Sequence, residues 1–251
     1  DHCEVAYNAD DGFEFFGGTV NVKYLSVLFG GDDGFDTDEG YQGMGQHLLV
    51  MLGTQGNHGT EMDSKTGGDF DSMPRSHPAF YSMTIIGGGA SGRSGGLMRL
   101  REGTGGKFGN VVLAHATDYG VKNDNCGAEL RTPTLPSAGT SLGMAGDSAS
   151  SGYLFFSPNN MISGATSTFN YGSGTSACTD AGFSAITADP GFASISSTTD
   201  LDYTTMGATF DPTAASSASS MCSAVDSAPF GDSFCKHESA STLRASYAVV
   251  C

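Results

Sequence analysis

DDGFE, at residues 10–14, is repeated as DDGFD at residues 32–36, a spacing of 22 residues. The same frame continues as NHGTE at residues 57–61, and more loosely as SGGLM at 94–98 and DYGVK at 118–122. In most copies of this frame the residue after the glycine is apolar, and the residue after that one is polar. This alternation is expected of a strand with one buried face. The sequence therefore predicts an internal repeat built from short strands.

A second apolar strand is predicted in each repeat. Seven residues before the aligned glycines Gly12, Gly34, Gly59 and Gly120 stand Val5, Val27, Leu52 and Leu113. Units of 22 to 25 residues cannot enclose a core alone, but stacked units bury a continuous interior. We therefore predict an all-β fold, a right-handed parallel β-helix. The longer gap between Gly59 and Gly96 predicts a surface excursion at about 64–77.

Two other folds are compatible with parts of this pattern. A leucine-rich repeat has a similar period, but its spaced leucines and asparagines are missing from this sequence. A β-sandwich also uses short strands and glycine turns, so it remains the alternative.

The overall charge excludes some classes of partner. The chain has 27 Asp and Glu residues against 11 Lys and Arg residues, a formal net charge of −16. This field repels phosphate backbones, so nucleic acid is not an expected partner. No stretch approaches the roughly 20 apolar residues of a membrane-spanning helix, so membrane insertion is not expected either.

Three segments also resemble a known group of proteins. They are DDGFEFFGGTVNVKYL at 10–25, GDDGFDTDEGYQG at 31–43 and GLMRLREGTGGKFGNVV at 96–112. They look like turns of large secreted bacterial and algal right-handed parallel β-helix proteins of the cell surface. The resemblance implies the fold and an extracellular or cell-surface location. It also implies further turns upstream of residue 10, so the chain is expected to be a fragment or a processed protein.

The chain divides by composition into two parts. Residues 1–126 are expected to form β-helix turns with an acidic ladder, and the Ser-, Ala- and Gly-rich residues 127–251 to form later turns and a C-terminal cap. Ser and Thr in the second part are candidates for O-linked sugars. The even cysteine count without metal-binding spacing predicts disulfides that brace the irregular C-terminal turns, in an oxidising compartment. The six cysteines are Cys3, Cys126, Cys178, Cys222, Cys235 and Cys251.

Stacking the repeats brings their acidic residues together. Equivalent residues of neighbouring parallel strands lie about 4.8 Å apart, so Asp10 is expected beside Asp32, and Glu14 beside Asp36. Calcium binds six to eight oxygens at about 2.3–2.6 Å and would relieve the repulsion. The candidate ligands are Asp10, Asp11, Glu14, Asp32, Asp33, Asp36, Asp38, Glu39, Glu61 and Asp63. The simpler interpretation is that these are solvated turn residues, since Asp is common before Gly in turns.

The expected function is an extracellular structural or cell-surface module, stiffened by calcium, in a wall, sheath or filamentous appendage. Its partners would be other copies of itself or other matrix and surface proteins. The alternative is a polysaccharide-processing lyase or hydrolase, or a carbohydrate-binding protein, with polysaccharide as the partner. Residues able to serve such an enzyme are Lys23, His47, Arg99, Arg101, His115 and Lys122. Nothing in their spacing joins them into one site, so no catalytic residue is assigned.

Overall fold

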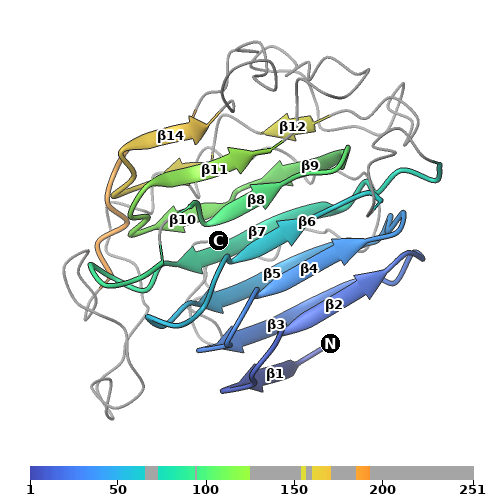
Figure 1. Cartoon of the computed structure of the whole chain (residues 1–251), viewed down its shortest axis with the longest axis horizontal. Coiled ribbons are helices and arrows are strands. Elements are labelled where there is room, and N and C mark those ends of the chain that lie inside the picture. The colour runs from blue at the N-terminus through green and yellow to red at the C-terminus, as the bar shows by residue number, and fades with distance from the viewer. Residues whose placement is uncertain (66–72, 94, 125–153, 157–159, 171–184, 193–251) are drawn as a thin grey trace, which may run out of the picture.

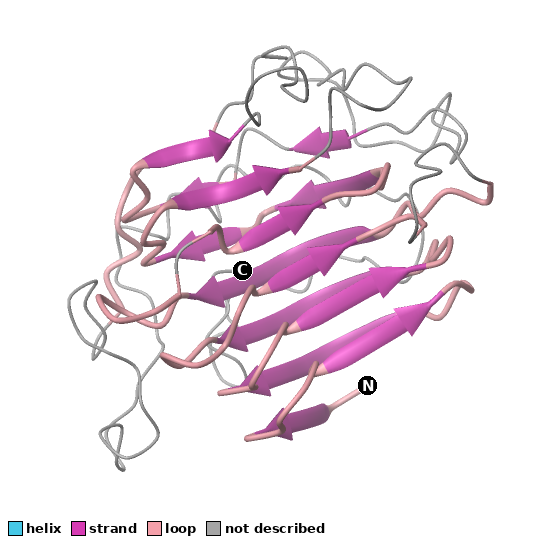
Figure 2. Cartoon of the chain, in the orientation of Figure 1, coloured by secondary structure: helices cyan, strands magenta, loops and turns pink. Residues whose placement is uncertain are grey.

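Strands are the main regular structure of the residues that the structure describes. The computed structural model describes residues 1–65, 73–93, 95–124, 154–156, 160–170 and 185–192. Strands and loops fill these ranges, and no helix occurs in them (Figure 2). Accordingly, none of these residues belongs to a helix long and apolar enough to cross a membrane.

The strands pair in parallel and stack turn upon turn into two sheets (Figure 1). Sheet A contains, in spatial order, β1 (Cys3–Ala6), β3 (Val22–Leu28), β5 (Met44–Met51), β7 (Ala79–Ile86), β10 (Val112–Ala114) and β13 (Met161–Ile162). In the same sheet, β9 (Gly106–Gly109) also pairs with β7, and β12 (Leu154–Phe156) pairs with β9. Sheet B contains β2 (Phe13–Phe16), β4 (Phe35–Asp38), β6 (Thr60–Met62), β8 (Met98–Leu100), β11 (Tyr119–Asn123) and β14 (Ser167–Asn170). The chain alternates between the sheets, so the fold is the predicted all-β parallel β-helix.

The repeated glycines allow the two sheets to approach each other. A β carbon at Gly12 would lie 2.5 Å from Cγ2 of Val27, and one at Gly59 would lie 2.2 Å from Cγ2 of Ile85. Real β carbons do not approach other atoms so closely, so any side chain here would push sheet B away from the core. The motif glycine is therefore required by packing between the sheets. The sequence had suggested a turn residue instead.

The register differs from the predicted frame in two places. Thr60 pairs with Met98, so Leu97 occupies the place in the fourth copy that the frame gave to Gly96. In sheet A, Val27 pairs with Val50, so Leu52 was wrongly placed in that column. The first error follows the long connection before β8, and the second arises because the β5–β6 corner, residues 52–59, is longer than the β3–β4 corner, residues 29–34.

Sheet A bends at one residue in each turn. This residue has a positive φ of 50 to 57° in every described turn, and the column consists of His2, Tyr24, His47, Ser82 and Asn110. The ring of Tyr24 stacks on that of His47, with centroids 4.9 Å apart. His47 is thus a buried member of this corner.

The second part of the chain is described only in pieces. β12, β13 and β14 continue both sheets beyond residue 126. The predicted excursion lies between β6 and β7, although its middle, residues 66–72, is outside the described residues. Cys3 is exposed and is the one cysteine among the described residues, so its predicted place in a disulfide stays a prediction. The other five cysteines, like the predicted cap at 193–251, lie outside the described residues.

Candidate functional site

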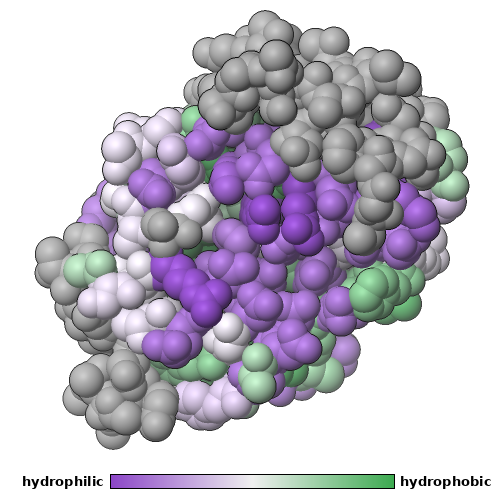
Figure 3. Space-filling view, in the orientation of Figure 1, coloured by the Kyte–Doolittle hydropathy of each residue, from purple (hydrophilic) through white to green (hydrophobic). Residues whose placement is uncertain are grey.

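Polar side chains form a continuous column on the outer face of sheet B. Hydrophilic residues gather over β4, β6 and β8 on the face seen in Figure 1 (Figure 3). The strand pairing puts one residue of each turn in this first column, in the order Glu14, Asp36, Glu61, Arg99, Lys122 and Asn170. The predicted stacking of Glu14 beside Asp36 is confirmed by this register. The column changes from acidic to basic between β6 and β8.

A second column runs beside the first, two residues further along each strand. Backbone hydrogen bonds put Asp63 beside Asp38, Arg101 beside Asp63 and Asp124 beside Arg101. Acids and bases therefore meet across both columns in the turns that contain β6, β8 and β11.

Both arginines of this face are held in ion pairs. Nε of Arg101 lies 2.7 and 2.8 Å from the two oxygens of Asp63. Its Nη2 lies 2.7 Å from Asp63 and 2.7 Å from Glu61. Arg99 contacts Glu61 at 3.1 Å and Asp124 at 2.9 Å. Because Glu61 and Asp63 are buried, these contacts compensate charges that water does not reach.

The acidic end of the site has no such arginine among the described residues. Oxygens of Asp11, Asp33 and Asp36 lie within 4.8 Å of one another, and so do oxygens of Asp10, Asp11 and Asp32. Asp11 accepts a hydrogen bond from the backbone N of Asp33 at 2.9 Å. One oxygen of Asp36, Oδ1, is buried and accepts no hydrogen bond from any described residue. The arrangement therefore presents several carboxylate oxygens at one place with few donors.

Burial and mutual repulsion shift the acidity of these groups. Burial raises the pKa of Asp36 to about 8, and the charges of Asp63, Asp11, Glu61 and Asp33 contribute to the rise. Burial likewise raises the pKa of Asp11 to about 6, although its hydrogen bond from Asp33 acts in the opposite direction.

The carboxyls beside the arginines shift less than Asp36. Burial raises the pKa of Glu61 to about 7 and that of Asp63 to about 6. Arg99 and Arg101 oppose the rise at Glu61, and Arg101 opposes it at Asp63. Ionisation is therefore most strongly opposed at Asp36, by its burial first and by the neighbouring carboxylates second.

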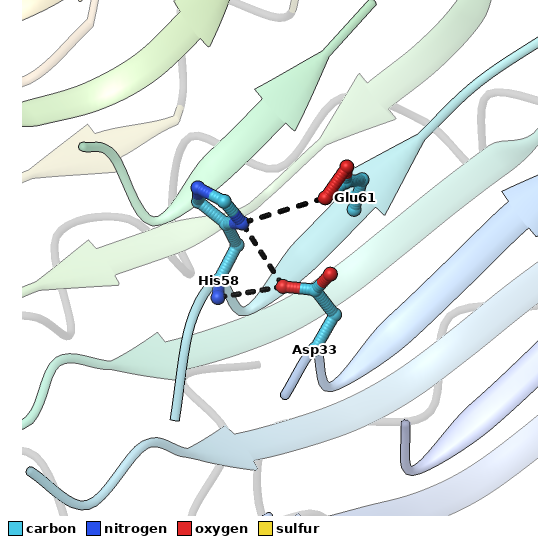
Figure 4. A group of neighbouring side chains, drawn as sticks. All are labelled: Asp33, His58 and Glu61. Atoms are coloured by element: carbon cyan, nitrogen blue, oxygen red, sulfur yellow. Dashed lines mark hydrogen bonds and ion pairs between the residues drawn. The ribbon is translucent and has the colours of Figure 1, made fainter. Parts of the chain in front are cut away.

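His58 joins this site, although sequence reasoning did not select it. Its Nδ1 lies 2.9 Å from Oδ1 of Asp33 and 3.8 Å from Oε1 of Glu61 (Figure 4). Its backbone N donates to the same Asp33 oxygen at 2.7 Å. The signal was present in the repeat, since His58 stands where the first two copies have Asp11 and Asp33. A histidine that follows two aspartates at this position of the repeat was the clue.

Two of the ten predicted acids lie at the other end of β4. Asp38 accepts a hydrogen bond from the backbone N of Glu39 at 2.6 Å. Glu39 lies at a corner with a positive φ and pairs with Lys65 at 2.6 Å. Glu39 is therefore held in an ion pair apart from the Asp11, Asp33 and Asp36 cluster.

The six residues considered for an enzyme do not form one site. Arg99, Arg101 and Lys122 lie together on the outer face of sheet B. Lys23 and His47 belong to sheet A, and His115 lies at the corner that follows β10. A catalytic set drawn from all six is therefore not supported.

The comparison with known proteins agrees with this architecture. A family model described as a pectate-lyase-like beta helix domain matches residues 1–181 of the 251-residue chain. No curated protein and no solved structure matches the chain. The family match covers more than half of the sequence and contains both the repeat and the columns of sheet B. The chain belongs to the family of pectate-lyase-like β-helix domains.

Proposed function

We propose that the chain is an extracellular β-helix module that binds calcium through the acidic end of the sheet B columns. The observation that carries this proposal is Asp36. Its Oδ1 is buried without a hydrogen-bond donor among the described residues, and its pKa is raised to about 8 beside further carboxylates. A bound cation would satisfy this oxygen and stabilise the ionised form.

The energetics favour a cation over unaided ionisation. Two charges one strand spacing apart, about 4.8 Å, repel by about 3 kcal/mol at an effective dielectric constant of about 20. Asp36 has two such neighbours in its own column, Glu14 and Glu61. Calcium holds oxygens at about 2.3–2.6 Å, so two ligands of one ion are up to about 5 Å apart. The spacing of neighbouring turns lies within that reach.

The donor set suits calcium better than zinc or copper. Asp11, Asp33 and Asp36 would supply oxygens directly, and Asp10 and Asp32 form an adjacent group around Asp11. All of these are hard carboxylate oxygens from neighbouring turns, a combination that accommodates the flexible coordination of calcium. The ion would link successive turns of the chain and so stiffen the stack. This supports a structural role, with other copies of the chain or other surface proteins as partners.

The test is calorimetric titration of calcium into chelator-treated protein, combined with thermal unfolding. At a calcium concentration of about 100 Kd we expect a stabilisation of about 2.7 kcal/mol, or roughly 5–10 °C for a chain of this size. Asp36→Asn should abolish both signals. Glu4→Gln, a change of the same kind at an exposed residue of β1, should leave them intact. Absence of binding heat together with an unchanged melting temperature would exclude the calcium site.

A second candidate function is binding or processing of an acidic polysaccharide. The specific observation is the change of sign in the first column, where Arg99 and Lys122, both partly exposed, follow the three acids. A polymer lying along this column would meet the cation site first and basic side chains next. Incubation with polygalacturonate and with neutral polysaccharides, in calcium, would test processing. If neither unsaturated nor reducing ends form, the enzymatic version of this candidate is wrong.

A further inference from the structure

A buried histidine outside the acidic site lacks hydrogen-bond partners for its ring among the described residues. His115 follows β10, and its side chain is 1% exposed. Neither Nδ1 nor Nε2 forms a hydrogen bond with a described residue. The ring of Phe192 packs edge-on against it, with centroids 6.0 Å apart, and the backbone N of His115 donates to Oγ of Ser163. Buried polar atoms in native proteins nearly always have a partner, so these two nitrogens suggest a ligand.

The imidazole borders a cavity of about 250 Å³ at the corner between the two sheets. Polar groups converge on it from three segments, and they belong to His115, Ser163, Thr168, Thr187 and Asp189. The volume is several times that of one water molecule, about 30 Å³. It is slightly below the roughly 300 Å³ at which pockets for drug-sized ligands begin. A ligand of one small ring fits these limits.

The distance between the two principal groups indicates what the ligand offers. Nε2 of His115 and Oδ1 of Asp189 are 3.9 Å apart, too far for a direct hydrogen bond. One hydroxyl oxygen placed beside the line between them can lie within about 2.8 Å of both. Such a hydroxyl would donate its one hydrogen to the carboxylate and accept from an imidazole N–H.

The charges around the cavity favour an uncharged ligand. Burial lowers the pKa of His115, so the ring is neutral at pH 7 and offers one donor and one acceptor. Asp189 is the charged lining residue, but its side chain is 61% exposed, so water screens its charge. The remaining polar side chains are hydroxyls, which exchange hydrogen bonds with other hydroxyls without a net charge.

We propose that this cavity binds a single uncharged sugar unit, with ring hydroxyls held between His115 and Asp189 and contacted by Ser163, Thr168 and Thr187. The site shares no residue with the proposed calcium site and does not depend on it. It lies at the corner that leads from sheet A to sheet B, so a sugar bound here would not occupy the outer columns of sheet B.

Saturation-transfer NMR on the full chain tests this with glucose, galactose, mannose and rhamnose, and with galacturonic acid and galactosamine as charged comparisons. We expect at least one neutral sugar to bind, and about tenfold weaker binding in Asp189→Asn, because one hydrogen-bonding partner is altered. His115→Phe, which keeps a ring but removes both nitrogens, should abolish binding. Glu4→Gln, at the far end of sheet A, should bind like the parent chain.

Each other result would overturn the proposal. It is wrong if no neutral sugar binds, if galactosamine alone binds, or if Asp189→Asn binds as tightly as the parent chain. If His115→Phe fails to fold, Ser163→Ala together with Asp189→Asn decides the same question. Repeating the sugar-binding measurement with chelator distinguishes this site from the proposed calcium site, because loss of calcium should not change the affinity for the sugar.

Discussion

Arg101 and Asp63 form a paired contact in which the guanidinium holds both oxygens of a nearly buried carboxylate, at 2.7 and 2.8 Å. The same guanidinium lies 2.7 Å from Glu61. Removing it leaves two buried carboxyls with less compensation. We expect Arg101→Ala to lower the free energy of unfolding by about 1–3 kcal/mol, below the roughly 3–5 kcal/mol of fully buried pairs because Arg101 is partly exposed. Urea unfolding measures this, with Lys65→Ala as the control at an exposed pair. Equal effects of the two substitutions would contradict this account.

Gly59 tests the close packing between the sheets. The three nearest atoms to a β carbon at Gly59 all belong to the side chain of Ile85, at 2.2 to 2.9 Å. Gly59→Ala should therefore destabilise the chain by about 1–3 kcal/mol through overpacking. Ile85→Ala alone should cost about 2–5 kcal/mol, since Ile85 is fully buried. The double variant should lose less stability than the sum of the losses in the two single variants, because the added methyl enters the vacated space. Strict additivity would rule out the contact as the cause.

The raised pKa of Asp36 predicts an unusual dependence of stability on pH. Burial takes this pKa from the 3.8 of an unperturbed aspartate to about 8 in the folded chain, so between these values the folded state binds more protons than the unfolded state. Stability of the chelator-treated protein should then fall as pH rises from about 4 to about 8. The raised pKa values of Asp11, Asp63 and Glu61 add to the fall between about 4 and 7. Unfolding in urea at pH 5, 6, 7 and 8 measures the slope, and a stability that rises with pH would disprove it.

Asp36→Asn separates the cost of ionisation from the benefit of a metal. The amide has nearly the same shape but cannot ionise, so without calcium the variant should be more stable than the parent chain at pH 8. With calcium the order should reverse, since the parent gains the ion and the variant does not. If the variant is less stable under both conditions, the carboxylate has another structural role.

His58 orders the corner before β6 through Asp33. One oxygen of Asp33 accepts hydrogen bonds from both Nδ1 and the backbone N of His58. His58→Ala removes the side-chain donor and leaves a buried carboxylate less satisfied, which should cost about 1–3 kcal/mol. His58→Asn, whose amide can still donate, should recover part of the loss. Thermal unfolding of the three proteins compares them, and an equal loss in both variants would contradict this role.

The sequence predicted the parts of the fold that depend on a short, regular period. The spacing of DDGFE and DDGFD predicted the pairing of Glu14 with Asp36 and of Phe13 with Phe35, because no long loop intervenes. Beyond Gly59 the connection lengthens, and the frame placed Gly96 where Leu97 stands. Leu97 thus puts a side chain where the other copies have glycine, and the repeat does not indicate which neighbouring residue makes room for it.

The sequence predicted which types of residue form the candidate site, but not which of them contact one another. Alternation indicated that Asp36 faces outward, but the frame placed Met98 in that column, where the structure has Arg99. It did not indicate that Arg99 would meet both Glu61 and Asp124, since these contacts depend on the conformations of long side chains. The acidic pattern alone did not indicate His58, because histidine is not an acid. His115 was considered for an enzyme, but its cavity is formed with residues 162–168 and 187–189, which the repeat does not align with it.

The loop between β6 and β7 has a practical consequence for protein engineering. β6 ends at Met62 and β7 begins only at Ala79, yet β6 still pairs with β4 and β8, and β7 with β5. The architecture thus tolerates a long insertion at this corner without a change of register. This makes the corner a natural position for grafting a foreign peptide or reporter, displayed on a rigid scaffold of fixed strand spacing.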